Sequence, residues 1–314
     1  MYKTAFKSLA SLLIMAASTL AATGQIVKDG IAYQILSVEN RTCEVSSKDG
    51  LAYGGTVNIP ATVVLNGLTF DVVGIRGWAF QFQSNLTAVI IPPSVKSIGE
   101  WAFSYTGISS IVIPNSVTYI GYCALRDCPN LASVTLPKDL NSIEREMFSN
   151  DKNLKRIEIP DNVQRILGSA FSGTGLTEIF IPKSVVALHE LIFSQCADLK
   201  AIYCGSPTPP GAQNDTFNGF DASACTLYVP TGAKSNYEND PHWFYFYGNT
   251  FESEIAGIDR TESVAGLNPE TPVEIFNTNG VCVYSGTYAN IPSTLNGIFI
   301  LKSPSHTAKI LLNN

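Results

Sequence analysis

Charge and histidine are scarce in this sequence. Only 15% of its 314 residues are charged, and 26 acidic residues against 20 basic ones give a formal net charge of −6. A chain without a basic excess does not bind nucleic acid by neutralising phosphates, so nucleic acid is excluded as a partner. Three histidines in the whole chain leave little material for histidine catalysis or a histidine-rich metal site. We therefore expect neither a metal nor another cofactor.

Catalytic motifs are lacking too. The sequence has no Gly-x-Ser-x-Gly, no His-Glu-x-x-His and no phosphate-binding glycine loop. His189 and His242 have no patterned partner, and the carboxylates are scattered as they are on a solvated surface. The paired acids of a glycoside hydrolase meet only in space, so a hydrolase stays the least favoured function. We predict a protein that is not an enzyme.

The one long apolar segment lies at the N-terminus. Lys3 and Lys7 precede an apolar run from Leu9 to Ala22, and small residues occupy the positions before Gln25. This pattern predicts a signal peptide over residues 1–24, because a membrane-spanning helix needs about 20 apolar residues. Its removal takes two lysines and leaves 18 basic against 26 acidic residues, a charge of −8. We expect an exported monomer, extracellular or on the outer cell surface, without a transmembrane segment in the mature chain.

The middle of the chain repeats with a period near 23 residues. Prolines end successive alternating apolar segments at intervals of 22, 23, 23 and 22 residues: Pro92, Pro114, Pro137, Pro160 and Pro182. A large apolar residue recurs with the same period: Phe80, Phe103, Leu125, Phe148, Phe171, Phe193 and Phe217. A branched aliphatic residue stands five positions before the first six of these: Ile75, Ile98, Ile120, Ile143, Ile166 and Leu188.

Each alternating segment predicts a short half-buried strand that ends at its proline. Burying the apolar side chains of one repeat gains roughly 8–18 kcal/mol. Ordering its residues costs more, at about 1–2 kcal/mol for each residue. One repeat is therefore unstable alone, and neighbouring repeats must stack at about 4.8 Å per strand. We predict a mainly β solenoid of about six to seven turns, called rungs below, over residues 75–203.

The combination of Ile-Gly, Ala-Phe, Leu and Ile-x-Ile-Pro-x-Ser-Val resembles the BspA-type leucine-rich repeat. The best copy runs from Ser94 to Pro114, and the resemblance covers roughly residues 27–250. It implies a secreted or cell-surface protein of anaerobic, often host-associated bacteria, in a family whose better-studied members bind host matrix proteins or other cells. The sequence departs from the pattern at Glu144–Met147 and at His189–Ile192. We expect the fourth and sixth rungs to be locally irregular.

Both ends of such a solenoid need caps. Residues 25–74, with turn signals such as Asn66-Gly67, predict an N-terminal β cap. Residues 204–254 predict the last rung and a C-terminal cap, in which the aromatic cluster at 243–247 closes the core rather than forming a ligand platform. Residues 255–272 are interpreted as a linker.

Residues 273–314 predict a small β-sandwich-like domain. Its strands are expected at Val273–Asn277, Val281–Tyr284, Gly297–Leu301 and Lys309–Leu312, with a hairpin turn at Asn279-Gly280. The segment resembles a C-terminal β-sandwich of exported proteins of the same bacterial group, some of which use it for secretion and surface attachment. A plain appended domain and a sorting signal both fit this pattern.

Seven cysteines are an odd number for an exported chain, so at least one is unpaired within it. Cys128 and Cys196 occupy the same repeat position and are predicted to be small buried apolar residues. Aligning the strands offsets Cys204 from Cys225 by four residues, about 13 Å along a strand. A disulfide allows only about 7 Å between Cα atoms, so we predict no bridge there.

Two sets of side chains are candidates for ligand binding. The outward position of each strand reads Ile90, Val112, Thr135, Glu158, Phe180, Tyr203 and Tyr228. The last three predict an exposed aromatic ladder, unless they only reflect strand propensity and cross-strand pairing. Trp78 and Trp101 share one position on adjacent rungs, where packing under the N-terminal cap is the alternative. Exposed stacked aromatics suit sugar rings and protein hot spots.

These observations favour a secreted, non-enzymatic binding or adhesion protein. We expect it to recognise a host extracellular protein or a glycan through the solenoid surface, with Trp78, Trp101, Phe180, Tyr203 and Tyr228 supplying contacts. Two alternatives remain open. The protein is either a polysaccharide-capture accessory in nutrient uptake, or a structural envelope component without a specific ligand.

Overall fold

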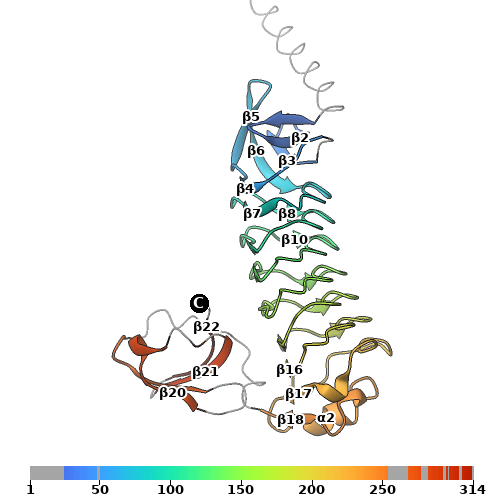
Figure 1. Cartoon of the computed structure of the whole chain (residues 1–314), viewed down its shortest axis with the longest axis vertical. Coiled ribbons are helices and arrows are strands. Elements are labelled where there is room, and N and C mark those ends of the chain that lie inside the picture. The colour runs from blue at the N-terminus through green and yellow to red at the C-terminus, as the bar shows by residue number, and fades with distance from the viewer. Residues whose placement is uncertain are drawn as a thin grey trace, which may run out of the picture.

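The computed structural model describes residues 25–47, 50–253, 268–276, 282–292, 295, 297–303 and 306–312. The predicted signal peptide, most of the predicted linker and the Asn279-Gly280 turn lie outside these residues. The fold is mostly β, a solenoid of about eight turns of about 23 residues with a separate antiparallel sheet near its C-terminal end (Figure 1). In the part of the chain that is described, no helix is both long enough and apolar enough to span a membrane.

Five strands fold the N-terminal residues back on themselves before the solenoid begins. They are β1 (Ile26–Lys28), β2 (Ile31–Ser37), β3 (Thr42–Val45), β5 (Thr62–Leu65) and β6 (Leu68–Ile75). Asn66 and Gly67 both have positive φ in the β5–β6 hairpin, as a two-residue turn of this kind requires. Strand β6 then pairs in parallel with β8 (Ser97–Ile98), which joins this part directly to the first rungs.

Two ladders of short parallel strands run along the solenoid. The first contains two-residue strands: β8, β10 (Tyr119–Ile120), β12 (Ser142–Ile143), β13 (Arg165–Ile166) and β15 (Ala187–Leu188). The second contains the strands predicted from the proline pattern: β4 (Gly55–Asn58), β7 (Leu86–Ile90), β9 (Ser110–Val112), β11 (Ser133–Thr135), β14 (Glu178–Ile181), β16 (Ala201–Cys204), β17 (Thr226–Val229) and β18 (Thr250–Glu252). The turns beyond the predicted number come from the two ends, since β4 pairs with β7 and β18 pairs with β17.

The fourth rung departs from the second ladder in one respect. Residues 155–159 belong to no strand, although Ile157 and Ile159 are buried as predicted. The fourth rung is thus irregular as expected, but at its strand, whereas the turns at Glu144–Met147 and His189–Ile192 are regular. Met147 and Ile192 replace the small alanine of other rungs and are fully buried, and both rungs keep the turn geometry of their neighbours. A larger apolar side chain is accommodated there because it faces the core.

Phenylalanine rings form the centre of the core. Phe80 stacks on Phe103 with ring centroids 5.4 Å apart, and Phe148 stacks on Phe171 at 5.7 Å. All four rings are fully buried. Each ring therefore fills the space under its neighbour, which supplies the burial that a single rung lacks.

The C-terminal end of the solenoid is closed by short helices and aromatic side chains. Helix α2 (Lys234–Glu238) and the 3₁₀ turns η1 (Ala222–Ala224) and η2 (Phe244–Phe246) lie between the last strands. Trp243 and Phe246 are fully buried, and the Trp243 indole N–H donates to the carbonyl of Pro210 at 2.9 Å. Closure of the core is thus confirmed for these two, whereas Phe244, Tyr245 and Tyr247 are exposed.

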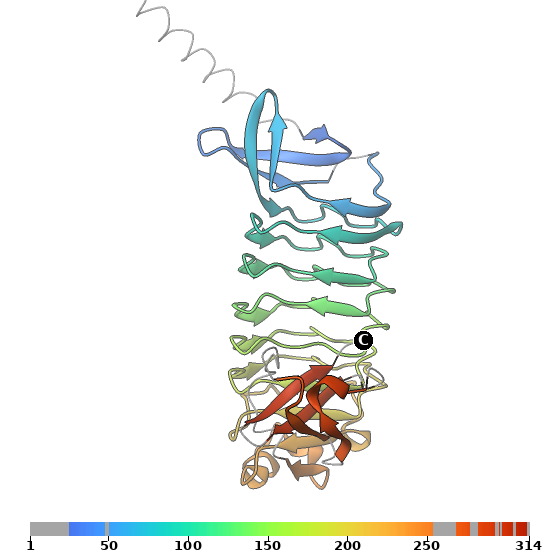
Figure 2. The ribbon, with the colours of Figure 1, turned by 90° about the vertical axis from the view of Figure 1, so that its left-hand side faces the viewer.

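The C-terminal sheet has the strand order β20-β19-β21-β22, all antiparallel. Its strands are β19 (Pro272–Phe276), β20 (Cys282–Thr287), β21 (Gly297–Ser303) and β22 (His306–Leu312), and η3 (Tyr288–Asn290) follows β20. Val273, Ile275, Phe299 and Leu301 form its small core. Figure 2 shows this sheet lying across the last rungs, on the side that carries the second ladder.

Candidate binding surface

The turn that joins the two strands of each rung has a repeated backbone shape. Counting from the core ring residue, positions −2 and +2 have positive φ. Position −2 is Trp78, Trp101, Cys123, Glu146, Ser169 and Leu191, and position +2 is Phe82, Tyr105, Asp127, Asn150, Gly173 and Gln195. Main-chain hydrogen bonds to the next rung hold this shape, for example from Trp78 to Glu100 at 2.9 Å and from Phe82 to Ser104 at 3.0 Å. The backbone alone therefore fixes where these side chains point.

Aromatic residues are costly at such positions. A left-handed backbone costs about 1–2 kcal/mol for an ordinary L-residue, whereas glycine, asparagine and aspartate tolerate it well. The third, fourth and fifth rungs use Asp127, Asn150 and Gly173 at position +2. The first two rungs use Phe82 and Tyr105 instead. The turn does not require aromatic rings, since the later rungs form it without them.

These rings belong to one patch on the first three rungs, which we call the aromatic surface. It consists of Trp78, Phe82, Trp101, Tyr105, Tyr119 and Tyr122. Phe82 is 66% exposed and stacks on Tyr105 with centroids 5.0 Å apart, and Trp101 meets Tyr122 edge-on at 6.4 Å. Within each of these two pairs the rings support one another, which restricts their side-chain motion.

Arg126 fixes the edge of the aromatic surface. Its guanidinium lies 5.5 Å from the centre of the Trp101 ring. The same group pairs with Asp127 at 2.8 Å and with Glu146 of the next rung. A hydrogen bond with Asp127 raises the pKa of the Tyr105 hydroxyl. Arg126 thus bridges two carboxylates, and this edge keeps one negative charge in excess.

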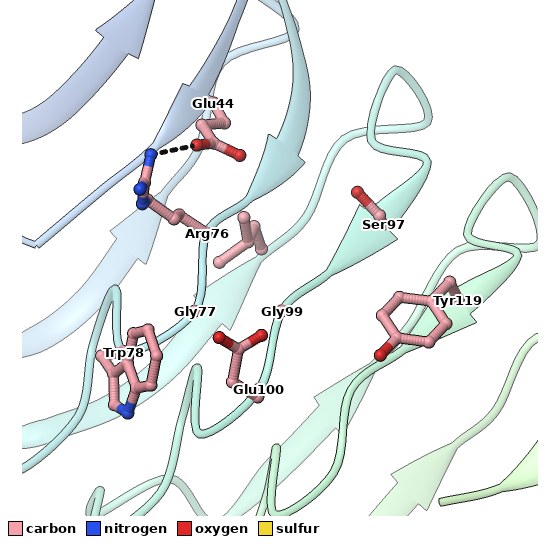
Figure 3. Close-up of a pocket in the computed structure, with 9 residues that line it drawn as sticks. Glu44, Arg76, Gly77, Trp78, Ser97, Gly99, Glu100 and Tyr119 are labelled. Atoms are coloured by element: carbon pink, nitrogen blue, oxygen red, sulfur yellow. Dashed lines mark hydrogen bonds and ion pairs between the residues drawn. The ribbon is translucent and has the colours of Figure 1, made fainter. Parts of the chain in front are cut away.

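A hollow opens where the first rungs meet the N-terminal strands (Figure 3). Its volume is about 280 Å³, and the side chains of Glu44, Arg76, Trp78, Glu100 and Tyr119 line it. Arg76 pairs with Glu44 at 3.0 Å. Burial raises the pKa of Glu44, and the charge of Arg76 opposes that shift. In Figure 3 the carboxylate of Glu100 lies between Trp78 and Tyr119.

Glycine forms the floor of this hollow. A Cβ atom at Gly99 would collide with the backbone nitrogen of Gly77 on the preceding rung. Only glycine allows the two main chains to approach so closely. The glycine of the Ile-Gly motif is therefore explained by stacking of the rungs and needs no ligand.

The repeats match a known protein family. Residues 74–200 match the BspA type leucine rich repeat region in six copies. This stretch is a BspA-type leucine-rich repeat region. A search of curated protein sequences finds no match.

Solved structures of other leucine-rich repeat proteins are similar to the chain. The Leucine Rich Repeat protein of T. pallidum (TpLRR) is 25% identical with a TM-score of 0.51, and the match covers 57% of this chain and 81% of that one. A leucine-rich repeat protein from Bacteroides ovatus is 23% identical with a TM-score of 0.34, covering 64% and 75%. The pneumococcal vaccine antigen PcpA is 14% identical with a TM-score of 0.34, covering 73% and 97%.

The predicted aromatic ladder on the leucine-rich repeats needs a correction. Its phase is right, because Ile90, Val112, Thr135 and Glu158 are exposed. Phe180 and Tyr203, however, are only 6% and 2% exposed, and Tyr228 is half-buried. They pack with Phe276 of β19, so the C-terminal sheet covers them. The ladder is an internal contact of this chain rather than an open platform.

The two predicted tryptophans, unlike the ladder, are not covered by the C-terminal sheet in any contact described above. Trp78 is 46% exposed, so it does not pack away under the N-terminal strands. Trp101 is half-buried beside Tyr122 and Arg126. Whether either binds a ligand remains a prediction.

The sequence interpretation missed four members of the aromatic surface: Phe82, Tyr105, Tyr119 and Tyr122. Comparing rungs two residues after the core ring would have revealed Phe82 and Tyr105, since later rungs carry aspartate, asparagine, glycine and glutamine there. Tyr119 and Tyr122 occur at positions where no other rung has an aromatic residue, so no repeat pattern marks them.

The cysteines behave as predicted. All seven are free, and all except Cys282 are buried. Cys204 lies opposite Ile181, while Cys225 precedes Thr226, which lies opposite Ala201. The four-residue offset is therefore confirmed.

The described residues contain no group of three or more potential metal ligands.

Proposed function

We propose that this protein is an exported, non-enzymatic binding protein that recognises a protein or a glycan at the aromatic surface. The observation that carries the proposal is the contrast within one position of the repeat. Phe82 and Tyr105 occupy left-handed positions that the third, fourth and fifth rungs fill with residues suited to that backbone, whereas the sixth rung has Gln195. Strained, exposed aromatic side chains are typical of functional sites, and aromatic residues dominate the energetics of binding.

The physical properties of the surface support this role. A Phe, Tyr or Trp side chain offers on the order of 150–250 Å² of contact area. The rings are held by main-chain bonds between rungs and by contact with one another. Little side-chain freedom is therefore lost when a ligand binds, which favours affinity.

The test is a binding screen of purified residues 25–314 on an array of host matrix proteins and polysaccharides. A Phe82→Asn/Tyr105→Asn variant removes two rings and leaves residues that suit the backbone. The matched control is Phe244→Ala/Tyr247→Ala, which removes a stacked and exposed aromatic pair at the C-terminal cap. We expect a ligand whose binding is lost in the first variant and kept in the control.

Two outcomes would contradict the proposal. Binding that both variants retain would place the ligand elsewhere on the molecule. An array without any hit would favour a structural role in the envelope. Competition then separates the ligand classes, because soluble polysaccharide displaces a glycan ligand and leaves a protein ligand bound.

A further inference from the structure

Glu100 differs from the glutamate at the equivalent position of another rung. Both Glu100 and Glu190 stand three residues before the core ring, in the second and sixth rungs. Glu190 pairs with Arg145. Among the residues that the structure describes, no lysine or arginine pairs with Glu100. The positions beside it on the adjacent rungs are Gly77 and Tyr122, so the repeat supplies no basic neighbour.

Trp78 differs from Trp101 in the same way. On the second rung, Trp101 has a cation beside its ring, because Arg126 of the third rung lies 5.5 Å from the ring centre. The residue equivalent to Arg126 beside Trp78 is Ser104. This serine is buried and donates its hydroxyl to the carbonyl of Arg126. The repeat thus places a guanidinium over the ring of Trp101, whereas among the described residues no cation lies over the ring of Trp78, and Arg76 in the same hollow pairs with Glu44.

The charges around the hollow leave an excess of one negative charge. Glu44 and Arg76 compensate each other across 3.0 Å, which leaves the carboxylate of Glu100. Trp78 and Tyr119 line the same hollow, and each exposes nearly half of its surface. A carboxylate between aromatic rings attracts a cation through both its charge and the ring quadrupoles.

We propose that this hollow binds a lysine or arginine side chain of a protein partner. The carboxylate of Glu100 accepts a hydrogen bond from the ammonium or guanidinium group, and Trp78 and Tyr119 contact its apolar stem and charged head. The volume of about 280 Å³ is slightly below that of small-molecule sites, which span about 300–1,000 Å³. It therefore suits one long side chain better than an oligosaccharide. This inference rests on the proposed binding function and names its partner class.

The test uses a fluorescein-labelled peptide of alternating glycine and lysine, with its lysine-acetylated form as the neutral counterpart. Fluorescence anisotropy at near-physiological salt measures binding to the chain without residues 1–24. Glu100→Gln removes the charge and keeps the shape. Glu190→Gln is the matched control, because it makes the same change in net charge at the same repeat position. Trp78→Ala removes one ring.

We expect the lysine peptide to bind and the acetylated peptide to bind at least about tenfold more weakly. Glu100→Gln and Trp78→Ala should each weaken binding about tenfold, and Glu190→Gln should change it less than about twofold. Equal losses in Glu100→Gln and Glu190→Gln would overturn the proposal, since they would indicate general attraction to an acidic protein. No preference for the charged peptide would overturn it as well.

The same variants separate this inference from the proposed function. An array ligand that is lost in Phe82→Asn/Tyr105→Asn but kept in Glu100→Gln, together with no binding of the lysine peptide, would retain the binding function and reject the cation site. Thermal melting of each variant shows whether the fold is intact. Glu100→Gln is close in shape to the original side chain, so its result does not depend on a change in folding.

Discussion

The rings of Phe82 and Tyr105 stack at 5.0 Å and within 23° of parallel, although both residues have a left-handed backbone. The left-handed conformation destabilises the folded state by about 1–2 kcal/mol for each residue. The ring stack stabilises it by only about 0.5–1.5 kcal/mol beyond the effect of the buried area. The pair therefore contributes little net stability. Its presence is consistent with the proposed binding function.

Replacing Tyr105 by asparagine should separate stability from binding. Asparagine adopts the left-handed backbone more easily than tyrosine, and this gain offsets the loss of the ring stack. The free energy of unfolding should therefore change by less than about 1.5 kcal/mol. Ligand binding should weaken. Urea unfolding and the binding array measure the two effects. The reverse change, Asn150→Tyr in the fourth rung, should destabilise the chain by about 1–2 kcal/mol. A stable Asn150→Tyr variant would show that the turn accepts aromatic rings at no cost.

Phe148→Ala should destabilise the solenoid strongly. The ring is fully buried and stacks on Phe171, and a Phe→Ala change in a core costs about 3–5 kcal/mol. Phe244→Ala, at a ring that is largely exposed, should change stability by less than about 0.5 kcal/mol. Chemical denaturation followed by circular dichroism compares the two. Similar midpoints would mean that the phenylalanine stack is not the centre of the core.

Asp151 should make stability depend on pH. Its carboxylate is fully buried and accepts a hydrogen bond from the Cys128 backbone N–H at 2.8 Å. Burial raises its pKa well above the ordinary value, and the charge of Asp127 adds to the shift. The folded state thus binds this proton more tightly than the unfolded state. The contribution is fully favourable below the unfolded pKa of about 3.9 and falls as pH rises towards the folded pKa.

Asp151→Asn mimics the protonated acid and removes this dependence. The variant should be more stable than the original chain at pH 7 by about 1 kcal/mol or more, and the difference should shrink towards pH 4. Urea midpoints between pH 4 and pH 8 give the comparison. A variant that is less stable at pH 7 would indicate that the ionised carboxylate is favourable in the folded state.

Phe276→Asp should expose the covered ladder. Phe276 packs with Phe180 and Tyr203, and a carboxylate cannot be buried there without a large penalty. Nitration of tyrosine with tetranitromethane, mapped by mass spectrometry, should increase at Tyr203 and Tyr228. Phe244 belongs to the C-terminal cap and is already exposed. Phe244→Asp should therefore leave the nitration of Tyr203 and Tyr228 unchanged. Protected tyrosines in Phe276→Asp would mean that other residues hold the sheet in place.

Thiol titration should distinguish Cys282 from the other cysteines. Cys282 is exposed, and the other six are buried. Burial raises the pKa of the Cys43 and Cys225 thiols to about 12, which keeps them protonated and unreactive. Ellman's reagent should count one thiol in the folded chain and seven after denaturation without reductant. A lower count after denaturation would reveal a disulfide.

The sequence was informative wherever a residue type is required by the repeat. Phe103, Ile98 and Pro114 recur because the core, the strand and its end each need that residue type, so their spacing predicted the rungs and their register. The offset between Cys204 and Cys225 followed from the same alignment. In a regular repeat, the place of a residue within its repeat determines whether its side chain faces the core or the surface.

Contacts between distant segments were beyond such reasoning. The phase placed Tyr203 on the outside of its strand correctly, yet burial there depends on Phe276, more than seventy residues later in the chain. The hollow beside Trp78 also combines side chains from an N-terminal strand and three rungs. The left-handed positions were missed because φ is not visible in a sequence when aromatic residues occupy them.

The in-register pairing of the rungs has a consequence for the dimensions of the molecule. Every rung adds one strand spacing, about 4.8 Å, to the separation between the hollow at Glu100 and the C-terminal sheet. A repeat inserted between the third and fourth rungs would lengthen this separation by that step and alter neither end. Such a series of chains would hold the hollow at a graded set of distances from the C-terminal sheet.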